Sequence, residues 1–190
     1  MIAGLILAAG AGTRFGSSDS KLLASLEGRP LLEHAVGAAC AVDELERIVV
    51  VLGAQADVVR QHVEFGRAEP VVCDEWDRGQ SMSLRCGAAA LSGAEKVIVT
   101  LGDEPLITPA VIRRFLNEPG GTRAVYHGRP GHPVVLGRAQ LRALSELSGD
   151  RGARELLNGD EIECSALSSG RDVDTPGDLE AIRDEVRAVI

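Results

Sequence analysis

The residues best suited to chemistry in this sequence lie in a glycine-rich segment, LAAGAGTRFG at residues 7–16, with a lysine shortly after it. Gly10 and Gly12 allow the backbone to turn tightly and to point N–H groups at phosphate oxygens. Arg14 and Lys21 add fixed positive charge that suits a polyphosphate. The spacing differs from the two common glycine-rich phosphate motifs, because no lysine follows Gly12 directly and the third glycine of the dinucleotide pattern is missing. The segment therefore predicts a phosphate-binding loop, with an ordinary glycine-rich turn as the alternative.

Two carboxylates stand where they would meet such a loop. Asp103 follows the apolar run Val97–Leu101 and one glycine, and Asp174 ends a short extended segment before a Thr-Pro helix start. In open α/β sheets, ligands bind at the carboxyl ends of the strands, and Mg²⁺ usually takes one or two carboxylates together with substrate phosphates. The pair therefore predicts a divalent-metal site at one edge of a sheet. The alternatives are that Asp103 only caps a turn and that acidic residues near Asp174 only favour a helix N-terminus.

Length, composition and charge fit a single domain over residues 1–190. The chain is 45% hydrophobic but 3% aromatic, which favours an α/β or helical interior over a β-sandwich. Its formal net charge of −8 argues against a general nucleic-acid or anionic-membrane binder, because both need a basic surface. The four cysteines show no CxxC spacing and are expected to be free thiols. Met1–Ala9 lacks the basic region of a signal peptide, and no apolar run approaches the ~18 residues of a membrane span, so a cytoplasmic protein is expected.

Apolar runs of strand length alternate with segments at helical spacing. Strands are expected at Ile2–Ala8, Ile48–Leu52, Val71–Cys73, Val97–Leu101, Arg123–Tyr126, Pro133–Leu136 and Glu161–Leu167. Helices are expected from Pro30 to Cys40, from Asp57 to Phe65, from Ser81 to Leu91, from Pro109 with Thr108 as its cap, along Leu141, Leu144 and Leu147, around Leu156 and Leu157, and from Pro176 onward with Thr175 as its cap. A turn is expected at residues 128–131. The alternation predicts one doubly wound α/β domain with a mostly parallel sheet.

Six patterns stand in order along the chain: LAAGAGTRFGSSDSK (7–21), WDRGQSMSLRCG (76–87), LGDEPLI (101–107), GHPVVL (131–136), GDRGARELL (149–157) and DVDTPGDL (172–179). They resemble the LAAGxSxRMGxxK, WxxGxxxSLxxG, LGDQPxL, GxP, GDxGAR and DIDTPEDL motifs of the MobA-like NTP transferase family. The resemblance is closest to its molybdenum cofactor cytidylyltransferase (MocA-type) branch, and it runs essentially from end to end. It implies a Rossmann-like fold of the nucleotide-diphospho-sugar transferase type.

The resemblance also implies a role for each matching residue. The nucleotide loop is formed by Leu7, Ala8, Ala9, Gly10 and Gly12. Arg14 and Lys21 bind the triphosphate, and with Asp103 they are the expected catalytic groups. Asp103 and Asp174 hold Mg²⁺. The base or ribose is expected to face Gly79, Ser81 and Ser83. His132 is expected to touch the acceptor, with a structural histidine as the alternative.

The implied reaction transfers a nucleoside monophosphate from an NTP to a small phosphorylated acceptor, with Mg²⁺ as cofactor and release of pyrophosphate. Within the family, Leu-Ala-Ala-Gly at residues 7–10 is associated with CTP, so CTP is the expected donor and molybdopterin or molybdenum cofactor the expected acceptor. A molybdoenzyme or its maturation chaperone is then the expected recipient of the product. The alternatives are GTP- or CTP-dependent transfer to another phosphorylated acceptor, and a molybdenum cofactor carrier without catalysis. Glu104 stands where the family has Gln; its negative charge beside the metal leaves the acceptor open.

Overall fold

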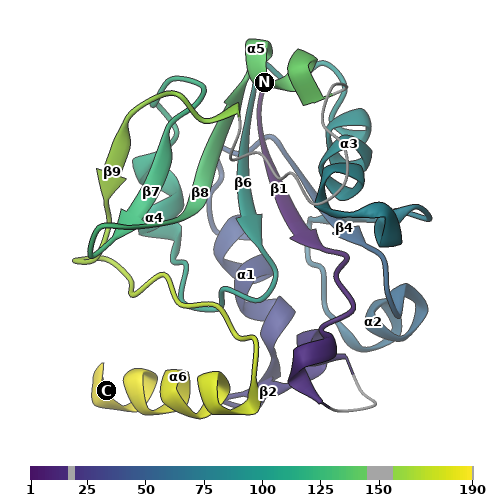
Figure 1. The fold of residues 1–190 in the computed structure, drawn as a ribbon, viewed down its shortest axis with the longest axis vertical. Coiled ribbons are helices and arrows are strands. Elements are labelled where there is room, and N and C mark those ends of the chain that lie inside the picture. Colours follow the sequence, from purple (N-terminus) through teal and green to yellow (C-terminus); the bar gives the residue numbers. More distant parts are fainter. Residues whose placement is uncertain (17–19, 145–155, 190) are drawn as a thin grey trace.

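A seven-stranded sheet forms the centre of the part of the chain that the computed structural model describes, residues 1–16, 20–144 and 156–189 (Figure 1). Its strands are β1 Ile2–Ala8, β4 Arg47–Leu52, β5 Glu69–Val72, β6 Lys96–Leu101, β7 Arg123–Tyr126, β8 Arg129–Gly137 and β9 Glu161–Glu163. Their spatial order is β5-β4-β1-β6-β8-β7-β9. Strands β5, β4, β1 and β6 run parallel to one another. Strand β8 is antiparallel to both of its neighbours, and β9 is parallel to β7. The sheet is therefore mostly parallel, as predicted.

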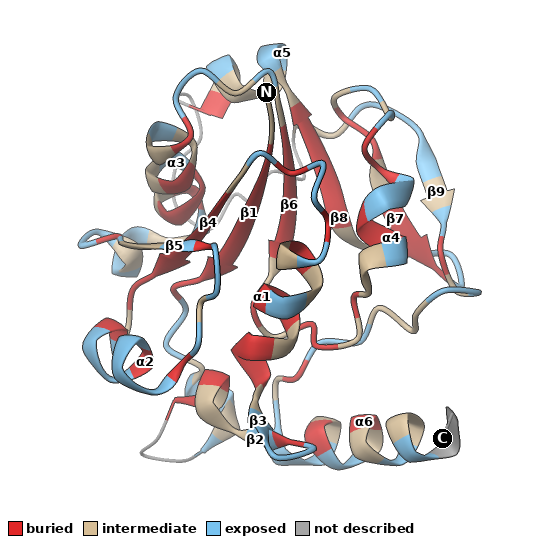
Figure 2. Cartoon of the chain, turned by 180° about the vertical axis from the view of Figure 1, so that it is seen from behind, coloured by how far each residue is buried: buried red, intermediate tan, exposed pale blue. Residues whose placement is uncertain are grey.

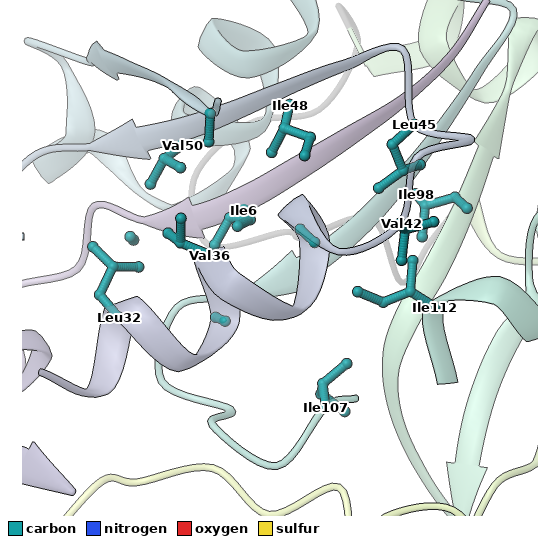
Figure 3. Packing of buried hydrophobic residues seen from close by; sticks show 14 of the residues in the cluster. Ile6, Leu32, Val36, Val42, Leu45, Ile48, Val50, Ile98, Ile107 and Ile112 are labelled. Atoms are coloured by element: carbon teal, nitrogen blue, oxygen red, sulfur yellow. The ribbon is translucent and has the colours of Figure 1, made fainter. Parts of the chain in front are cut away.

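Helices cover both faces of this sheet (Figure 2). They are α1 Leu31–Cys40, α2 Ala56–His62, α3 Gln80–Ala90, α4 Pro109–Arg114, α5 Arg138–Ala143 and α6 Pro176–Val189. Successive strand residues point to opposite faces. Ile6 and Val50 therefore pack with α1 and α4 (Figure 3), whereas Leu5 and Val49 pack with Leu84 of α3 on the other face. The predicted doubly wound arrangement is confirmed.

The three central strands end together at one edge of the sheet. The parallel register places Ala8 of β1 beside Leu52 of β4, and Leu7 beside Leu101 of β6. Residues Ile48–Leu52 are fully buried, which agrees with the prediction of a strand covered on both faces. The segments that follow β1 and β6 therefore start side by side from buried strands, although they are far apart in the sequence.

The turns after β6 differ from the prediction. β8 begins at Arg129, not at Pro133, because the chain reverses at His127 and Gly128. Both have positive φ, 51° and 74°, as a two-residue hairpin turn of this kind requires. The turn expected at 128–131 is therefore wrong. β9 ends at Glu163 instead of Leu167, because the chain turns where the Leu167 N–H donates to the Cys164 carbonyl.

Helix boundaries also shift at several ends. α2 stops at His62 rather than Phe65, because Val63 already has extended angles (φ −115°, ψ 130°). α1 starts at Leu31, because Pro30 belongs to a small antiparallel pair, β2 (Ser25–Leu26) and β3 (Arg29–Pro30). Leu147 and most of the helix expected around Leu156 lie in residues 145–155, outside the described part.

Other expectations agree with the structure. Thr108 caps α4 by accepting a hydrogen bond from the Val111 N–H at 3.3 Å. Leu179 and Ile182 of α6 are buried against Leu26 and Leu31, which fixes the C-terminal helix to the start of α1. The four cysteines are free. None of the helices in the described residues is long and apolar enough to cross a membrane.

Gly87 is a position where α3 packs closely on the sheet. A Cβ there would lie 2.9 Å from Val51 Cγ2 and closer still to Leu5 Cδ1. We expect Gly87→Ala to lower the free energy of unfolding by about 1–3 kcal/mol, because the helix must move away from β1 and β4. The control is Gly37→Ala in α1, where the site is exposed and the substitution should raise stability by about 0.5–1 kcal/mol. Urea unfolding measures both, and a stabilised Gly87→Ala would contradict the close packing.

Candidate active site

The loop after β1 folds back on the lysine predicted to act with it. Gly12 has left-handed backbone angles (φ 61°, ψ 30°) and leads into a short 3-10 helix, η1 (Thr13–Phe15). The Phe15 N–H closes this turn on the Gly12 carbonyl at 2.9 Å. A Cβ at Gly12 would lie 3.0 Å from Cγ of Lys21, which begins a second 3-10 helix, η2 (Lys21–Leu23). Glycine at this position therefore serves both the backbone angle and the close approach of the Lys21 stem.

A cavity of about 310 Å³ opens beside this loop, at the ends of β1 and β6. Its lining includes eight residues predicted from the sequence: Leu7, Ala8, Gly10, Gly12, Arg14, Lys21, Asp103 and Asp174. Thr13, Leu22, Leu101 and Asp172 also line it. Among the described residues, five other predicted ones stand outside this lining: Ala9, Gly79, Ser81, Ser83 and His132.

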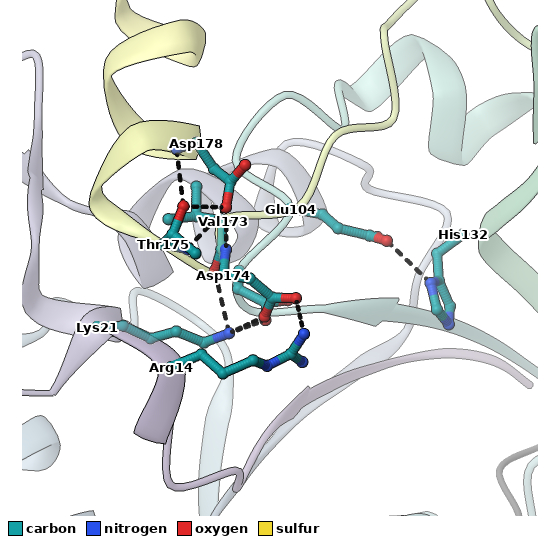
Figure 4. Close-up of polar contacts among 9 residues, drawn as sticks. Arg14, Lys21, Glu104, His132, Val173, Asp174, Thr175 and Asp178 are labelled. Carbon is teal, nitrogen blue, oxygen red and sulfur yellow. Dashed lines mark hydrogen bonds and ion pairs between the residues drawn. The ribbon is translucent and has the colours of Figure 1, made fainter. Parts of the chain in front are cut away.

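Lys21 lies between the two carboxylates predicted to bind metal. Its Nζ is 2.5 Å from Asp103 Oδ2. It is also 3.2 Å from Asp174 Oδ1 and donates to the Val173 carbonyl at 3.0 Å (Figure 4). Arg14 Nη1 contacts the other oxygen of Asp174 at 2.8 Å. The Lys21 side chain is 10% exposed, whereas that of Arg14 is 75% exposed. The two basic groups and the two carboxylates therefore form one cluster, with Lys21 at its buried centre.

The carboxylates keep Lys21 charged. Burial disfavours the ammonium form, but attraction by Asp103 and hydrogen bonds to Asp103 and Asp174 outweigh it and raise the pKa of Lys21 above 10.5. Asp172 behaves differently: burial raises its pKa above 3.8, and the nearby charges of Asp174 and Asp103 add to this. Asp172 was not predicted as a site residue. Its only signal in the sequence was its place one residue before Val173 in the same acidic motif.

A backbone contact brings Asp174 to Asp103. The Val173 N–H donates to the Asp103 carbonyl at 2.9 Å, and the Val173 side chain is fully buried. Asp178 then fixes the chain after it: its Oδ2 accepts from the Thr175 N–H at 2.7 Å and from the Asp174 N–H at 3.2 Å. Asp178 thus acts at the start of α6, as expected of an acidic residue at a helix N-terminus.

The two carboxylates fit a divalent cation of the Mg²⁺ type. Asp103 and Asp174 each direct an oxygen at the same cationic group, the Lys21 ammonium, and Mg²⁺ prefers hard oxygen ligands. Within residues 1–16, 20–144 and 156–189, no three His, Cys, Asp or Glu side chains are grouped as ligands of one ion. The other ligands of a bound Mg²⁺ would therefore be substrate phosphates and water, as is usual for this ion.

Glu104 and His132 form a buried pair on the β8 side of Asp103. Glu104 Oε1 lies 3.0 Å from His132 Nδ1, and their side chains are 5% and 23% exposed (Figure 4). Burial raises the pKa of Glu104 above 4.5, against the attraction of His132. Burial would lower the pKa of His132, but Glu104, then Asp103 and Asp172, raise it above 6.5. The negative charge expected from Glu104 therefore meets a basic partner inside the protein.

The residues predicted to face the base or ribose lie at the start of α3. Gly79 is the N-cap, with φ 109°, and follows the 3-10 helix η3 (Trp76–Arg78). Ser81 is fully buried, Ser83 is 5% exposed, and the Ser81 hydroxyl has no hydrogen-bond partner in the described part of the chain. Ala9 is buried, and its carbonyl accepts from the Ala54 N–H at 3.0 Å, which joins the loops after β1 and β4.

Comparison with known proteins identifies the family. Residues 4–166 match the model of the MobA-like NTP transferase domain. The chain belongs to this family. It is 35% identical to nicotine blue oxidoreductase of Paenarthrobacter nicotinovorans over 190 residues, with 92% of each chain covered. Among solved structures, the Rv0371c homolog from Mycobacterium sp. strain JC1 is 28% identical with a TM-score of 0.87, covering 100% of this chain and 98% of that one.

Membership of the MobA-like NTP transferase family places the chain among nucleotidyltransferases by descent and confirms the fold predicted from its six motifs. A metal-bound relative is also known. Rv0371c of Mycobacterium tuberculosis H37Rv in complex with manganese is 26% identical, with a TM-score of 0.78 over 96% of this chain and 98% of that one.

The free energy of unfolding should fall as the pH rises above 6.5, because raised pKa values of His132 and Glu104 mean that the folded protein binds more protons than the unfolded one. The His132 contribution is complete below pH 6.5 and is lost as the pH passes the raised pKa of the folded state. In Glu104→Gln this dependence should weaken, since a neutral amide does not attract the imidazolium. Urea unfolding between about pH 6 and pH 9 measures it. The control His62→Gln, on exposed α2, should keep the wild-type dependence, and an unchanged slope in Glu104→Gln would contradict the pairing.

Proposed function

We propose that this protein transfers CMP from CTP to a small phosphorylated acceptor, molybdopterin or molybdenum cofactor, and releases pyrophosphate. The observation that supports this best is the meeting of Arg14, Lys21, Asp103 and Asp174 beside a left-handed glycine turn. A triphosphate with its metal needs both kinds of charge, and a doubly wound sheet keeps its ligands at this edge. CTP as the donor is supported by Leu-Ala-Ala-Gly at residues 7–10.

In the proposed reaction, an acceptor phosphate oxygen attacks the α-phosphorus of CTP. The new P–O bond forms as the bond from the α-phosphorus to the bridging β-phosphate oxygen breaks, and pyrophosphate leaves. Lys21 and Arg14 stabilise the negative charge that moves onto the pyrophosphate. Asp103 and Asp174 hold Mg²⁺, which when bound neutralises charge on the phosphates. The residues act by position and charge, and no covalent intermediate with the protein is needed.

The surrounding residues would provide specificity. The start of α3, with Gly79, Ser81 and Ser83, would face the base or ribose once it moves toward the cavity, because Ser81 and Ser83 are buried and none of the three lines the cavity in this structure. His132 would touch the acceptor from β8, with its ring held by Glu104. Transfer from GTP, transfer to another phosphorylated acceptor, and molybdenum cofactor carriage without catalysis remain the alternatives. After CMP transfer to molybdenum cofactor, the product would pass to a molybdoenzyme or its maturation chaperone in the cytoplasm.

A second candidate is redox chemistry, and one specific observation favours it. The relative that is 35% identical over 92% of both chains is named an oxidoreductase. A redox cofactor that carries phosphate groups would find the basic side chains of Arg14 and Lys21 in the same cavity, as a triphosphate would. Stabilisation by NADPH, without stabilisation by any NTP and Mg²⁺, would favour this candidate over nucleotidyl transfer.

Thermal unfolding of the purified protein should show Mg²⁺-dependent stabilisation that is largest with CTP among CTP, GTP, ATP and UTP. A ligand at a hundredfold excess over its Kd adds about 2.7 kcal/mol, so a functional site gives a clear shift. Lys21→Ala should reduce the shift with CTP more than the shift with CMP, because Lys21 is assigned to the triphosphate. A larger shift with GTP would reassign the donor, and the absence of a shift with every nucleotide would contradict the proposed site.

Asp103→Asn should reduce turnover by a factor on the order of 100 or more, because a transition-state contact of this kind typically contributes that much. Pyrophosphate release with CTP, Mg²⁺ and molybdenum cofactor measures the rate. The control is Asp184→Asn on an exposed position of α6, which should keep the wild-type rate. Wild-type turnover by folded Asp103→Asn would remove Asp103 from the metal site.

A further inference from the structure

We propose that Lys21 occupies the metal position in the nucleotide-free protein, so that the Asp103–Asp174 pair takes up a divalent cation only together with a triphosphate. This inference rests on the proposed function, because it assumes that the two carboxylates bind the metal. It adds that Lys21 has two alternating partners. In the free protein it binds the carboxylates, and in the complex it binds the phosphates.

The geometry of the cluster leaves little of the carboxylate pair open to a metal. Lys21 Nζ is within hydrogen-bond distance of Asp103 Oδ2 (2.5 Å) and Asp174 Oδ1 (3.2 Å), and a third contact to the Val173 carbonyl (3.0 Å) holds it between them. Arg14 contacts Asp174 Oδ2 at 2.8 Å. Three of the four oxygens of the pair therefore already face a basic side chain.

An ammonium group and Mg²⁺ cannot share this position. Mg²⁺ requires its ligands at about 2.0–2.1 Å in nearly octahedral geometry, so an ion bound to both carboxylates through the oxygens that face Lys21 would lie close to the present place of Nζ. Repulsion between the two positive charges at such a distance is strong in a partly buried site, and the Lys21 side chain is 10% exposed. Binding of free metal must therefore displace Lys21 without offering it a new partner.

A triphosphate supplies that partner. The Lys21 stem lies against Gly12, inside the loop predicted to bind phosphate, and a lysine side chain has a flexible four-carbon stem. Movement of the ammonium from the carboxylates to the phosphates would open the pair and neutralise new negative charge in one step. Because coupling between two ligands is reciprocal, the triphosphate strengthens metal binding and the metal strengthens triphosphate binding by the same factor.

The test is Mn²⁺ binding to the full chain, measured as free Mn²⁺ by electron paramagnetic resonance, first without nucleotide and then with CTP. The wild type should bind Mn²⁺ weakly alone and much more tightly with CTP, after subtraction of the Mn²⁺ that the same concentration of CTP binds without protein. Lys21→Met should bind Mn²⁺ at least tenfold more tightly than the wild type without nucleotide, because the carboxylates lose their occupant. The double variant Lys21→Met with Asp103→Asn should lose this gain.

Arg14→Met is the matched control, because it removes the same charge from a side chain that is 75% exposed and contacts Asp174 from the edge of the cluster. Its gain in Mn²⁺ affinity should be clearly smaller than that of Lys21→Met. Equal gains would show a general charge effect and would overturn the inference. Lys21→Gln is measured beside Lys21→Met, and thermal unfolding establishes that each variant is folded.

Failure of the Lys21 inference and failure of the proposed metal site give different results. If the wild type binds Mn²⁺ with CTP but Lys21→Met and Lys21→Gln gain nothing without nucleotide, Lys21 does not block the site, although the metal site stands. If neither the wild type with CTP nor the lysine variants bind Mn²⁺ through Asp103, the metal assignment itself fails, and the inference fails with it.

Discussion

The contact on which the site depends is the hydrogen bond from the Val173 N–H to the Asp103 carbonyl, 2.9 Å long. It joins the segment before α6 to the end of β6 and so places Asp103 and Asp174 at one point. Two carboxylates held this closely repel each other, and the arrangement is stable because Lys21 lies between them and Arg14 covers the outer oxygen of Asp174. Lys21 and Arg14 are therefore structural partners of Asp103 and Asp174 in this structure.

The rest of the fold keeps this contact in place. β1, β4 and β6 are parallel and end in register, so the loop after β1 and Asp103 after β6 start from neighbouring points. On the other side, α6 is anchored by Leu179 and Ile182 against Leu26 and Leu31, in the same apolar cluster as Val173. Packing thus fixes the two segments that carry Asp103 and Asp174.

Glu104, which stands where the family motif has glutamine, is paired with His132 inside the protein. A glutamate beside the metal was expected to add negative charge that an anionic acceptor would meet. Instead, Glu104 is buried and directs one oxygen at His132 Nδ1, so its charge is met by a group on the neighbouring strand. The same pairing orients the ring of His132, the residue proposed to touch the acceptor. Glu104 is thus directed at His132 and is not among the residues that line the cavity.

The sequence by itself determined the features that depend on local pattern: the central strands, the helices between them, the glycine turn and the acidic motifs after β6 and before α6. Apolar periodicity and motif order are properties of short segments, so they can be read without a structure. The sequence did not reveal the turn at His127 and Gly128, because a histidine with positive φ carries no strong local signal. The strand predicted for this region was longer than β9, because the alternation of residue types continues past the point where the chain turns. Only the tertiary structure decided that Lys21 bridges Asp103 and Asp174, that Asp172 lines the same cavity, and that Glu104 pairs with His132. Each of these contacts joins segments far apart in the chain, and their distances are set by how the strands and α6 pack together.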